Sequence, residues 1–308
     1  MKQRANGVNI FLLLYLILYL SISVVGDFFL PSQVIGYVEQ FLPLVLGILY
    51  LKFTRQPILS TIKVKKVHPA TIPLTVLFTF FIWPLLSVVN NISLLFSKNL
   101  ISDTVTNNIL QKGVLLTLIT SALFPAIVEE FTFRGVLYSQ YRNERPIKAA
   151  LLSGLCFGLM HMNFNQFSYA FVLGVILALL IEASGSILPS MLVHFTFNAV
   201  SIVGVSVAQT SMISSGMIAS TTLKLSKISL PIKDATAILT GALVVVSFFI
   251  ACMIYRKIAK LNKNWNQIAY SRHERPYALR SNPKLTDAYF YAFVIICFLM
   301  CLLMQFAM

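Results

Sequence analysis

The sequence predicts an all-α polytopic membrane protein, a bundle of about 8–9 transmembrane helices with no β-sheet domain. Hydrophobic residues make up 57% of the 308 residues, and charged residues make up only 11%, against roughly 25% in soluble domains. Apolar runs of about 17 to 28 residues also recur along the chain, each long enough to cross a ~30 Å hydrocarbon core. So few charges cannot cover a globular surface in water, which excludes a soluble enzyme, a disordered protein and a nucleic-acid-binding domain.

Nine apolar runs are expected to form the spans, and the fifth and sixth are short. They comprise residues 8–30, 34–53, 69–96, 113–141, 147–164, 167–183, 186–209, 234–256 and 287–308. The first run follows a basic N-terminus as a signal peptide does, but it is long and no small-residue cleavage site follows it, so we expect it to be retained. The cysteines are all inside apolar runs without a C-x-x-C pair, which predicts buried thiols and no disulfide framework.

Basic residues give the expected orientation, because cytoplasmic loops are enriched in Lys and Arg. Alternating nine spans from a cytoplasmic N-terminus places eighteen basic residues inside and five outside. The inside set is Lys2, Arg4, Lys52, Arg55, Lys63, Lys65, Lys66, Arg142, Arg145, Lys148, Arg256, Lys257, Lys260, Lys263, Arg272, Arg275, Arg280 and Lys284; the outside set is Lys98, Lys112, Lys224, Lys227 and Lys233. The net charge of +14 therefore indicates topology and contact with anionic lipid, not nucleic acid.

Three parts of the chain are expected to differ in role. Residues 1–112 supply the first three spans, residues 113–209 form a catalytic core, and residues 210–308 supply variable C-terminal spans. The last part includes the basic cytoplasmic segment 256–286, in which Trp265, Tyr270 and Tyr277 are expected to anchor the chain along the inner surface.

The candidate functional residues are polar groups inside apolar spans, where ionisable side chains are expensive. They are Glu129, Glu130 and Arg134 in the fourth span, Phe157 and His161 in the fifth, and His194 and Asn198 in the seventh. Counting along helices from the span ends places Glu129 and His161 about 20 Å deep and His194 about 12 Å deep. We therefore expect these groups to converge within the membrane.

Helical spacing predicts which of these polar groups pair with one another and which are free to face a cavity. Glu130 and Arg134 are four residues apart, as in a helical salt bridge, so we expect an internal ion pair that leaves Glu129 free to face a cavity. Pro125 frees a carbonyl one turn before Glu129 and predicts a kink, which serves either water entry or packing. Gly154 and Gly158 are spaced for close helix packing.

The chemistry of this set remains open between several interpretations. A desolvated carboxylate with an opposing imidazole can activate water, and a second imidazole with an amide can stabilise an oxyanion. Two histidines and a carboxylate could instead be zinc ligands. The same groups could also form a structural polar network, or a proton relay in a carrier, although no inverted repeat supports a carrier.

The three motifs together resemble the CPBP intramembrane proteases, the family of the type II CAAX prenyl endopeptidase and of bacterial Abi or bacteriocin-immunity proteins. Glu129-Glu130-x-x-x-Arg134, Phe157-x-x-x-His161 and His194-x-x-x-Asn198 occur in this order within roughly residues 113–205. The resemblance implies that Glu129 is the general base, that His161 is its partner, and that His194 and Asn198 bind the oxyanion. It implies supporting roles for Glu130, Arg134 and Phe157.

The expected function is an intramembrane endopeptidase that hydrolyses a peptide bond of a membrane-associated protein or peptide. The alternative is a non-catalytic membrane regulator, or a bacteriocin-immunity scaffold, of the same fold. No cofactor is assigned: a metal-independent reaction is favoured, the H-E-x-x-H motif is absent, and zinc remains an option. The expected location is a bacterial plasma membrane with a cytoplasmic N-terminus, and the expected partners are the substrate and the lipid bilayer.

Overall fold

The computed structural model describes residues 2–26, 28–98, 101–142, 146–214, 235–270 and 285–307. In these ranges the chain forms helices and no strand, and eight helices are long and apolar enough to cross a membrane. This confirms the all-α polytopic fold. The elements are α1 (Lys2–Gly26), α2 (Ser32–Phe53), α3 (Ile58–Thr61), α4 (Thr71–Ser93), α5 (Ile101–Leu118), η1 (Ile119–Leu123), α6 (Phe124–Glu129), η2 (Glu130–Tyr138), α7 (Ser139–Tyr141), α8 (Pro146–Leu159), α9 (Phe164–Ser184), α10 (Leu188–Ser214), α11 (Ala235–Leu261), α12 (Trp265–Tyr270) and α13 (Ala288–Ala307).

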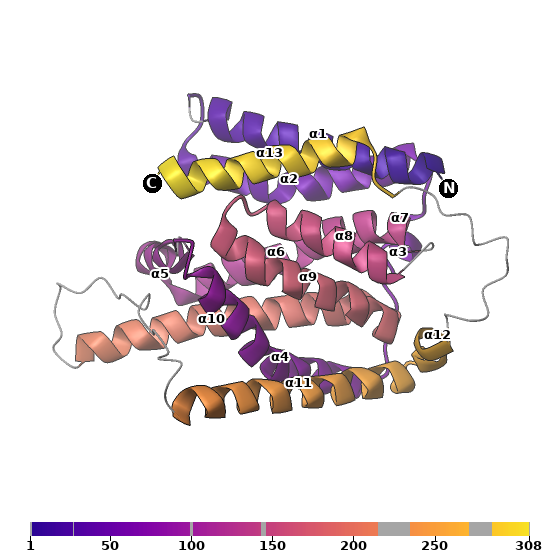
Figure 1. Ribbon diagram of the computed structural model, residues 1–308. Coiled ribbons are helices and arrows are strands. Elements are labelled where there is room, and N and C mark those ends of the chain that lie inside the picture. Colours follow the sequence, from indigo (N-terminus) through magenta and orange to yellow (C-terminus); the bar gives the residue numbers. More distant parts are fainter. Residues whose placement is uncertain are drawn as a thin grey trace.

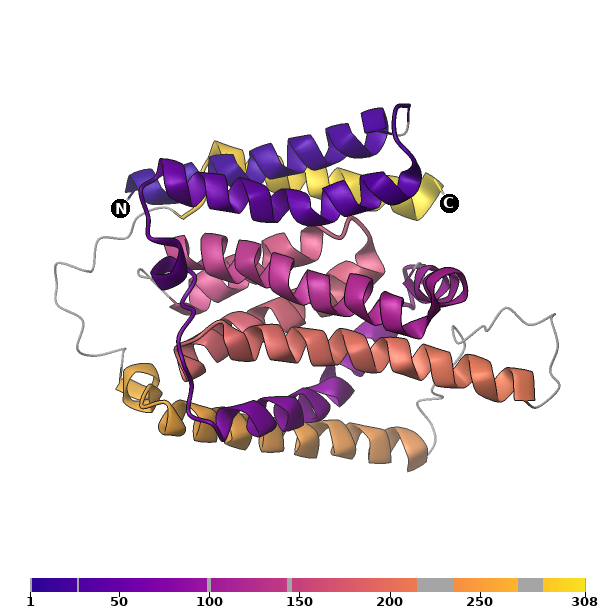
Figure 2. The same ribbon diagram turned by 180° about the vertical axis from the view of Figure 1, so that it is seen from behind.

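Most of the long helices run roughly along one common direction and form three layers, whereas α5 is seen nearly end-on (Figures 1 and 2). Helices α1, α2 and α13 form one outer layer, and α4 and α11 lie at the opposite side. The predicted catalytic segments, α6 with η2, α8 and α9, lie between them, and α10 packs against α4, α5 and α9. The two ends of the chain lie at opposite ends of the bundle (Figure 1).

The fifth expected span, 147–164, is shorter than predicted. Helix α8 ends at Leu159 and has 14 residues, about 21 Å at 1.5 Å per residue, which is less than a bilayer core. His161 therefore lies in the turn between α8 and α9, and the prediction that it continues the helix of Phe157 is wrong. Met162 in this turn adopts a left-handed φ of 54°, and the Asn163 side chain accepts a hydrogen bond from the amide of Gln166 as α9 begins. The turn thus ends α8 before it can cross the bilayer.

The fourth expected span, 113–141, begins where the backbone breaks. Gly113 has φ 78° and ψ 165°, which interrupts the helix that starts at Ile101. The turns at 119–123 and 130–138 are π-helical, and they flank α6 with Pro125 in its first turn. Wider π turns are common at functional sites, and here they bracket Glu129.

Close packing of α8 on α9 depends on small residues, as predicted for Gly154 and Gly158. A β-carbon at Gly158 would lie 2.9 Å from the carbonyl oxygen of Phe167, and one at Gly154 would lie 3.0 Å from that of Phe171. From the other helix, Gly174 faces Gly154, with its added β-carbon 2.9 Å from the Gly154 Cα. The two helices therefore pack backbone to backbone.

One end of the bundle, here called the basic end, gathers connections that are far apart in sequence. The amide of Ile187 donates to the Lys63 carbonyl at 3.0 Å, and the amide of His68 donates to the Asn262 side chain at 3.0 Å. Arg142 forms two 2.9 Å hydrogen bonds with the carboxylate of Glu182. The α2–α3 and α3–α4 connections, the end of α7, the α9–α10 turn and the end of α11 therefore meet at one end.

The cysteines and the basic segment 256–286 can also be compared with their predictions. All four cysteines are free thiols, and Cys156, Cys297 and Cys301 are buried as predicted. The prediction of burial is wrong for Cys252, which is exposed on α11 because an apolar run does not show which face of its helix packs against the bundle. In the segment 256–286, the guanidinium of Arg256 lies 5.1 Å from the Trp265 ring. Some predictions fall outside what the structure describes: these concern the side chains of Lys2, Arg4 and Tyr270 and the residues Tyr277, Arg145, Arg272, Arg275, Arg280, Lys284, Lys224, Lys227 and Lys233.

Candidate active site

The centre of the site is the fully buried carboxylate of Glu130. Its Oε1 lies 2.9 Å from Nη1 of Arg134 and 3.0 Å from Nδ1 of His194, and its Oε2 accepts a hydrogen bond from the Ser190 hydroxyl. Two hydrogen-bonding side chains and the Arg134 cation around one carboxyl group require it to be ionised. The predicted ion pair of Glu130 with Arg134 is confirmed, and it also holds α10 against η2.

Phe157 packs between the charged and aromatic members of the site. The Arg134 guanidinium carbon lies 4.2 Å from the centroid of its ring, a cation–π contact. The rings of His161 and His194 meet the same ring edge to face, with centroid distances of 5.0 and 5.6 Å. Phe157 is 1% exposed, so it fixes the relative positions of both imidazoles without being available to a substrate.

His161 has a defined tautomer. Its Nδ1 lies 2.8 Å from the carbonyl oxygen of Phe157, and a carbonyl oxygen can only accept a hydrogen bond. Nδ1 therefore carries the proton, and Nε2 of the neutral ring is left as an acceptor and base.

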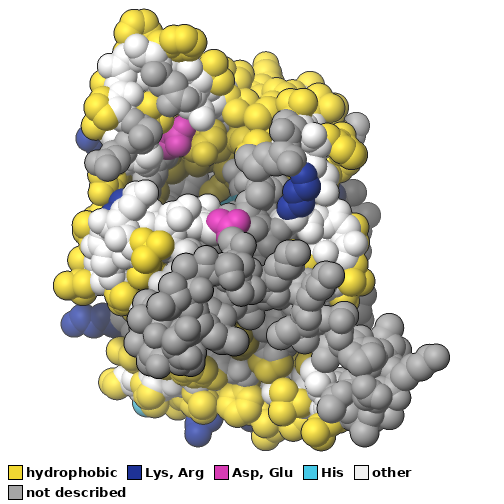
Figure 3. Space-filling model, turned by 90° about the vertical axis from the view of Figure 1, so that its left-hand side faces the viewer, with side chains coloured by type: hydrophobic (Ala, Val, Ile, Leu, Met, Phe, Trp, Pro, Cys, Tyr) yellow, Lys and Arg dark blue, Asp and Glu magenta, His cyan; other side chains and the backbone are white. Residues whose placement is uncertain are grey.

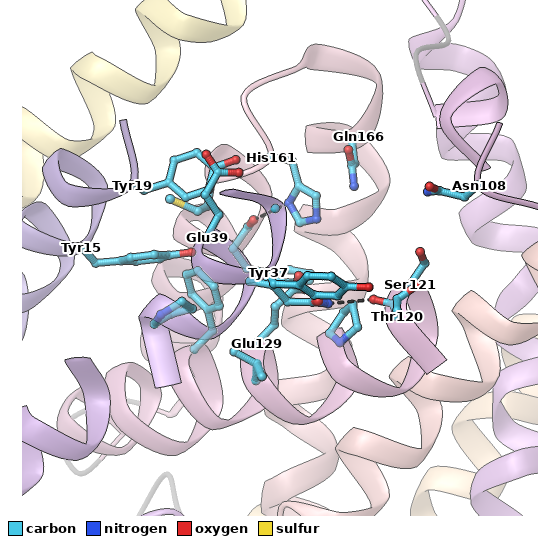
Figure 4. Close-up of a pocket in the computed structure, with 18 of the residues that line it drawn as sticks. Tyr15, Tyr19, Tyr37, Glu39, Asn108, Thr120, Ser121, Glu129, His161 and Gln166 are labelled. Atoms are coloured by element: carbon cyan, nitrogen blue, oxygen red, sulfur yellow. Dashed lines mark hydrogen bonds between the residues drawn. The ribbon is translucent and has the colours of Figure 1, made fainter. Parts of the chain in front are cut away.

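Glu129 differs from Glu130 in its surroundings, as the sequence predicted. Its side chain is 31% exposed, and its Oε2 lies 3.7 Å from Nε2 of His194. It lines a cavity of about 580 Å³ together with His161. The two groups come from separate elements, the end of α6 and the α8–α9 turn, and the cavity brings them to one space (Figure 4).

His194 and Asn198 on α10 do not line this cavity. His194 is 3% exposed, and its two ring nitrogens lie close to the carboxylates of Glu129 and Glu130. Asn198 is half-buried one turn further along α10, and in the described part of the chain its side chain makes no hydrogen bond to another residue. The structure thus brings Glu129, His161 and His194 together around Phe157, and it leaves Asn198 at the edge.

The cavity contains polar residues that the sequence analysis did not single out. These are Tyr15 and Tyr19 from α1, Tyr37, Glu39 and Gln40 from α2, Asn108, Gln111 and Lys112 from α5, Thr120 and Ser121 from η1, and Gln166 from α9 (Figure 4). Glu39 could have been found by the criterion used for the other carboxylates, since it is ionisable within the apolar run 34–53. The tyrosines and amides have no sequence signal of this kind, because they are common in membrane helices.

Glu182, a further carboxylate, lies outside the cavity in a separate polar cluster. Besides the two bonds from Arg142, it accepts a 2.8 Å hydrogen bond from the Tyr138 hydroxyl. It lies at the basic end and joins α9 to η2 and the end of α7.

The donor set does not fit a zinc ion. In the described residues, no three His, Cys, Asp or Glu side chains gather as metal ligands. The candidate set of two histidines and a glutamate therefore does not form such a site in this arrangement, and nothing proposed below depends on a metal.

A comparison with protein families finds a match over residues 111–200, to the family described as type II CAAX prenyl endopeptidase Rce1-like. This range contains all three motifs and the elements from the end of α5 to the middle of α10. The resemblance to the CPBP family is confirmed over these residues. At family level the match supports a CAAX-type intramembrane protease. Neither the curated proteins nor the solved structures gave a significant match to the chain.

Proposed function

We propose that the chain is an intramembrane endopeptidase that uses water activated by Glu129 and His161 to hydrolyse a peptide bond of a membrane-associated protein or peptide. The observation that carries the proposal is the shared cavity: an ionisable carboxylate and an imidazole with an unprotonated Nε2 face the same polar space inside a membrane-spanning bundle. A water between two such acceptors can lose a proton to the carboxylate as it attacks a carbonyl carbon.

The roles of the other residues follow from the contacts of His194. Its Nδ1 proton is directed at Glu130, so Nε2 can donate to an oxyanion only when the ring is an imidazolium. That charge, with Arg134, would balance the two glutamates, so the group is neutral when all four are ionised. We propose His194 as the positive member of the oxyanion site. Asn198 is proposed as its second donor, supported by its place one turn along the same helix.

The proton taken by Glu129 must reach the leaving amine for the bond to break. Glu129 is the only group in the proposal that holds this proton after attack, and its partial exposure to the cavity lets it reach the nitrogen of the tetrahedral intermediate. Collapse of that intermediate returns the oxyanion to a carbonyl and releases the amine product. The atoms of one water molecule are then divided between the two peptide products.

The test is a comparison of membrane peptides in cells with the wild-type chain, cells with Glu129→Gln and cells without the chain. The same uncleaved peptides should accumulate in the last two strains. For a peptide identified in this way, Glu129→Gln should lower kcat by about 10²- to 10⁴-fold, the usual contribution of a general base.

Glu182→Gln is the matched control, because it makes the same chemical change at the basic end, away from the cavity. At equal amounts of folded protein it should cleave close to the wild-type rate. A Glu129→Gln protein that also cleaves at the wild-type rate would refute the role of Glu129 as the base. Identical membrane peptides in wild-type cells and in cells without the chain would favour the non-catalytic regulator.

A further inference from the structure

The direction in which the cavity opens can be derived from the exposure of its lining residues. At its closed end lie Val128 and Phe157, which are 2% and 1% exposed. At its other end lie Tyr37 on α2, 42% exposed, and Gln111 on α5, also exposed. Figure 3, which faces this end of the bundle, shows a hollow with acidic and basic side chains at its edges. The cavity therefore opens toward the end formed by the start of α2, α5 and the α8–α9 turn.

This open end is opposite the basic end of the bundle. Gln166 lines the cavity within the first turn of α9, whereas Glu182 pairs with Arg142 at the last turn of the same 21-residue helix. Similarly, Gly36 lines the cavity near the start of α2, and Lys52 lies at the end of that helix. Figure 1 places the N-terminus at the basic end, away from α5.

Charge differs strongly between the two ends of the described structure. Eleven basic residues lie at the basic end and two lie at the open end. The first set is Lys52, Arg55, Lys63, Lys65, Lys66, Arg142, Lys148, Arg256, Lys257, Lys260 and Lys263; the second is Lys98 and Lys112. Because Lys and Arg near the ends of spans are retained on the cytoplasmic side, the fold assigns its basic end to the cytoplasm.

We infer that the catalytic cavity opens to the extracytoplasmic side of the membrane. If the proposed function holds, the substrate is then a peptide segment presented from outside the cell or from the outer half of the bilayer, and the cytoplasm does not supply it directly. The open end suits a peptide, because it offers hydroxyl, amide and charged side chains to hydrogen-bond a polar backbone. A hydrocarbon chain would gain little from this lining.

The test is thiol labelling of intact cells with a membrane-impermeant, charged maleimide. Gln111→Cys places a thiol at the open end, and Lys66→Cys, at an equally exposed position, places one at the basic end. The parent chain measures labelling of the native cysteines, of which only Cys252 is exposed. Gln111→Cys should be labelled in intact cells, and Lys66→Cys only after permeabilisation.

The opposite pattern would overturn the inference. Lys98→Cys, exposed at the open end outside the cavity, gives the same readout if the thiol at position 111 does not react. Labelling needs no proteolysis, so it tests the orientation even if the chain is not an enzyme. With a known substrate, modification of Gln111→Cys in intact cells should also slow cleavage, while modification of Lys98→Cys should not. Correct labelling without any effect on cleavage would contradict substrate entry through this end and leave the orientation in place.

Discussion

At the scale of single residues, Glu129 and Glu130 show how neighbours in a sequence acquire different chemistry. Glu130 is fully buried: His194 and Ser190 hydrogen-bond to its carboxylate, and Arg134 forms an ion pair with it. Glu129 is partly exposed to a cavity and has one long contact of 3.7 Å with His194. A group with satisfied hydrogen bonds stabilises the fold, whereas a group that faces a cavity can exchange protons.

The buried ion pair leads to a stability prediction. Glu130→Gln should lower the free energy of unfolding by about 3–5 kcal/mol, because it leaves the Arg134 charge buried without a countercharge. The double variant Glu130→Gln with Arg134→Met should be more stable than Glu130→Gln alone, since no unpaired charge remains. Unfolding in detergent, followed by circular dichroism, measures both. A double variant that is less stable than Glu130→Gln would mean that Arg134 stabilises the fold mainly through another contact, such as the Phe157 ring.

At the scale of elements, the α8–α9 hairpin positions His161. The short helix α8 ends in a turn within the bundle, and the close approach of its glycines to α9 fixes where that turn lies. The imidazole is then held by Phe157, four residues earlier in the last turn of α8. A catalytic group on a tight turn between two closely packed helices has little freedom to move, which suits a base that must hold one water.

The hairpin gives a prediction with an internal control. Gly158→Ala should destabilise the protein by about 1–3 kcal/mol, because its β-carbon would overlap the Phe167 carbonyl at 2.9 Å. Gly204→Ala in α10 meets nothing within 4 Å and should stabilise by up to about 1 kcal/mol, as expected for glycine replaced inside a helix. Thermal unfolding of both variants in the same detergent compares them. Equal shifts of the unfolding temperature in the two variants would show that α8 and α9 move apart more easily than their close packing indicates.

At the scale of the whole molecule, charged side chains tie distant parts of the chain together at the basic end. Lys63 lies in the α3–α4 connection near Arg142 and Glu182, which come from the end of α7 and from α9. Burial and the charge of Arg142 lower the pKa of Lys63 to about 8, and the charge of Glu182 partly opposes this shift. The folded protein therefore holds the Lys63 proton less tightly than the unfolded chain does.

This difference predicts a pH dependence. Between about pH 8 and pH 10.5 the unfolded chain binds the Lys63 proton and the folded protein has lost it, so stability should rise with pH across this window. Lys63→Met should raise the unfolding midpoint at pH 7 and reduce that rise. Lys98→Met, a change at an exposed position at the opposite end of the bundle, should leave the slope unchanged. The check is the unfolding midpoint at pH 7 and pH 10, and equal slopes for wild type and Lys63→Met would contradict the prediction.

The sequence alone determined the fold class and the motif set, because both depend on local properties. Hydrophobic length shows which segments can cross a bilayer, and an i,i+4 spacing shows that Glu130 and Arg134 can pair on any helix of this kind. The match over residues 111–200 and the 2.9 Å ion pair agree with these predictions.

Tertiary structure decided the rest. The end of α8 before His161, the pairing of Glu182 with Arg142, and the cavity that unites Tyr19, Glu39 and Glu129 depend on contacts between segments far apart in the chain. Such contacts leave no local periodicity, since each depends on the shape of the opposing surface and not on the neighbours in sequence. The direction in which the cavity opens is likewise a property of the assembled bundle, because only the folded chain brings basic residues from distant helix ends to the same end of the molecule.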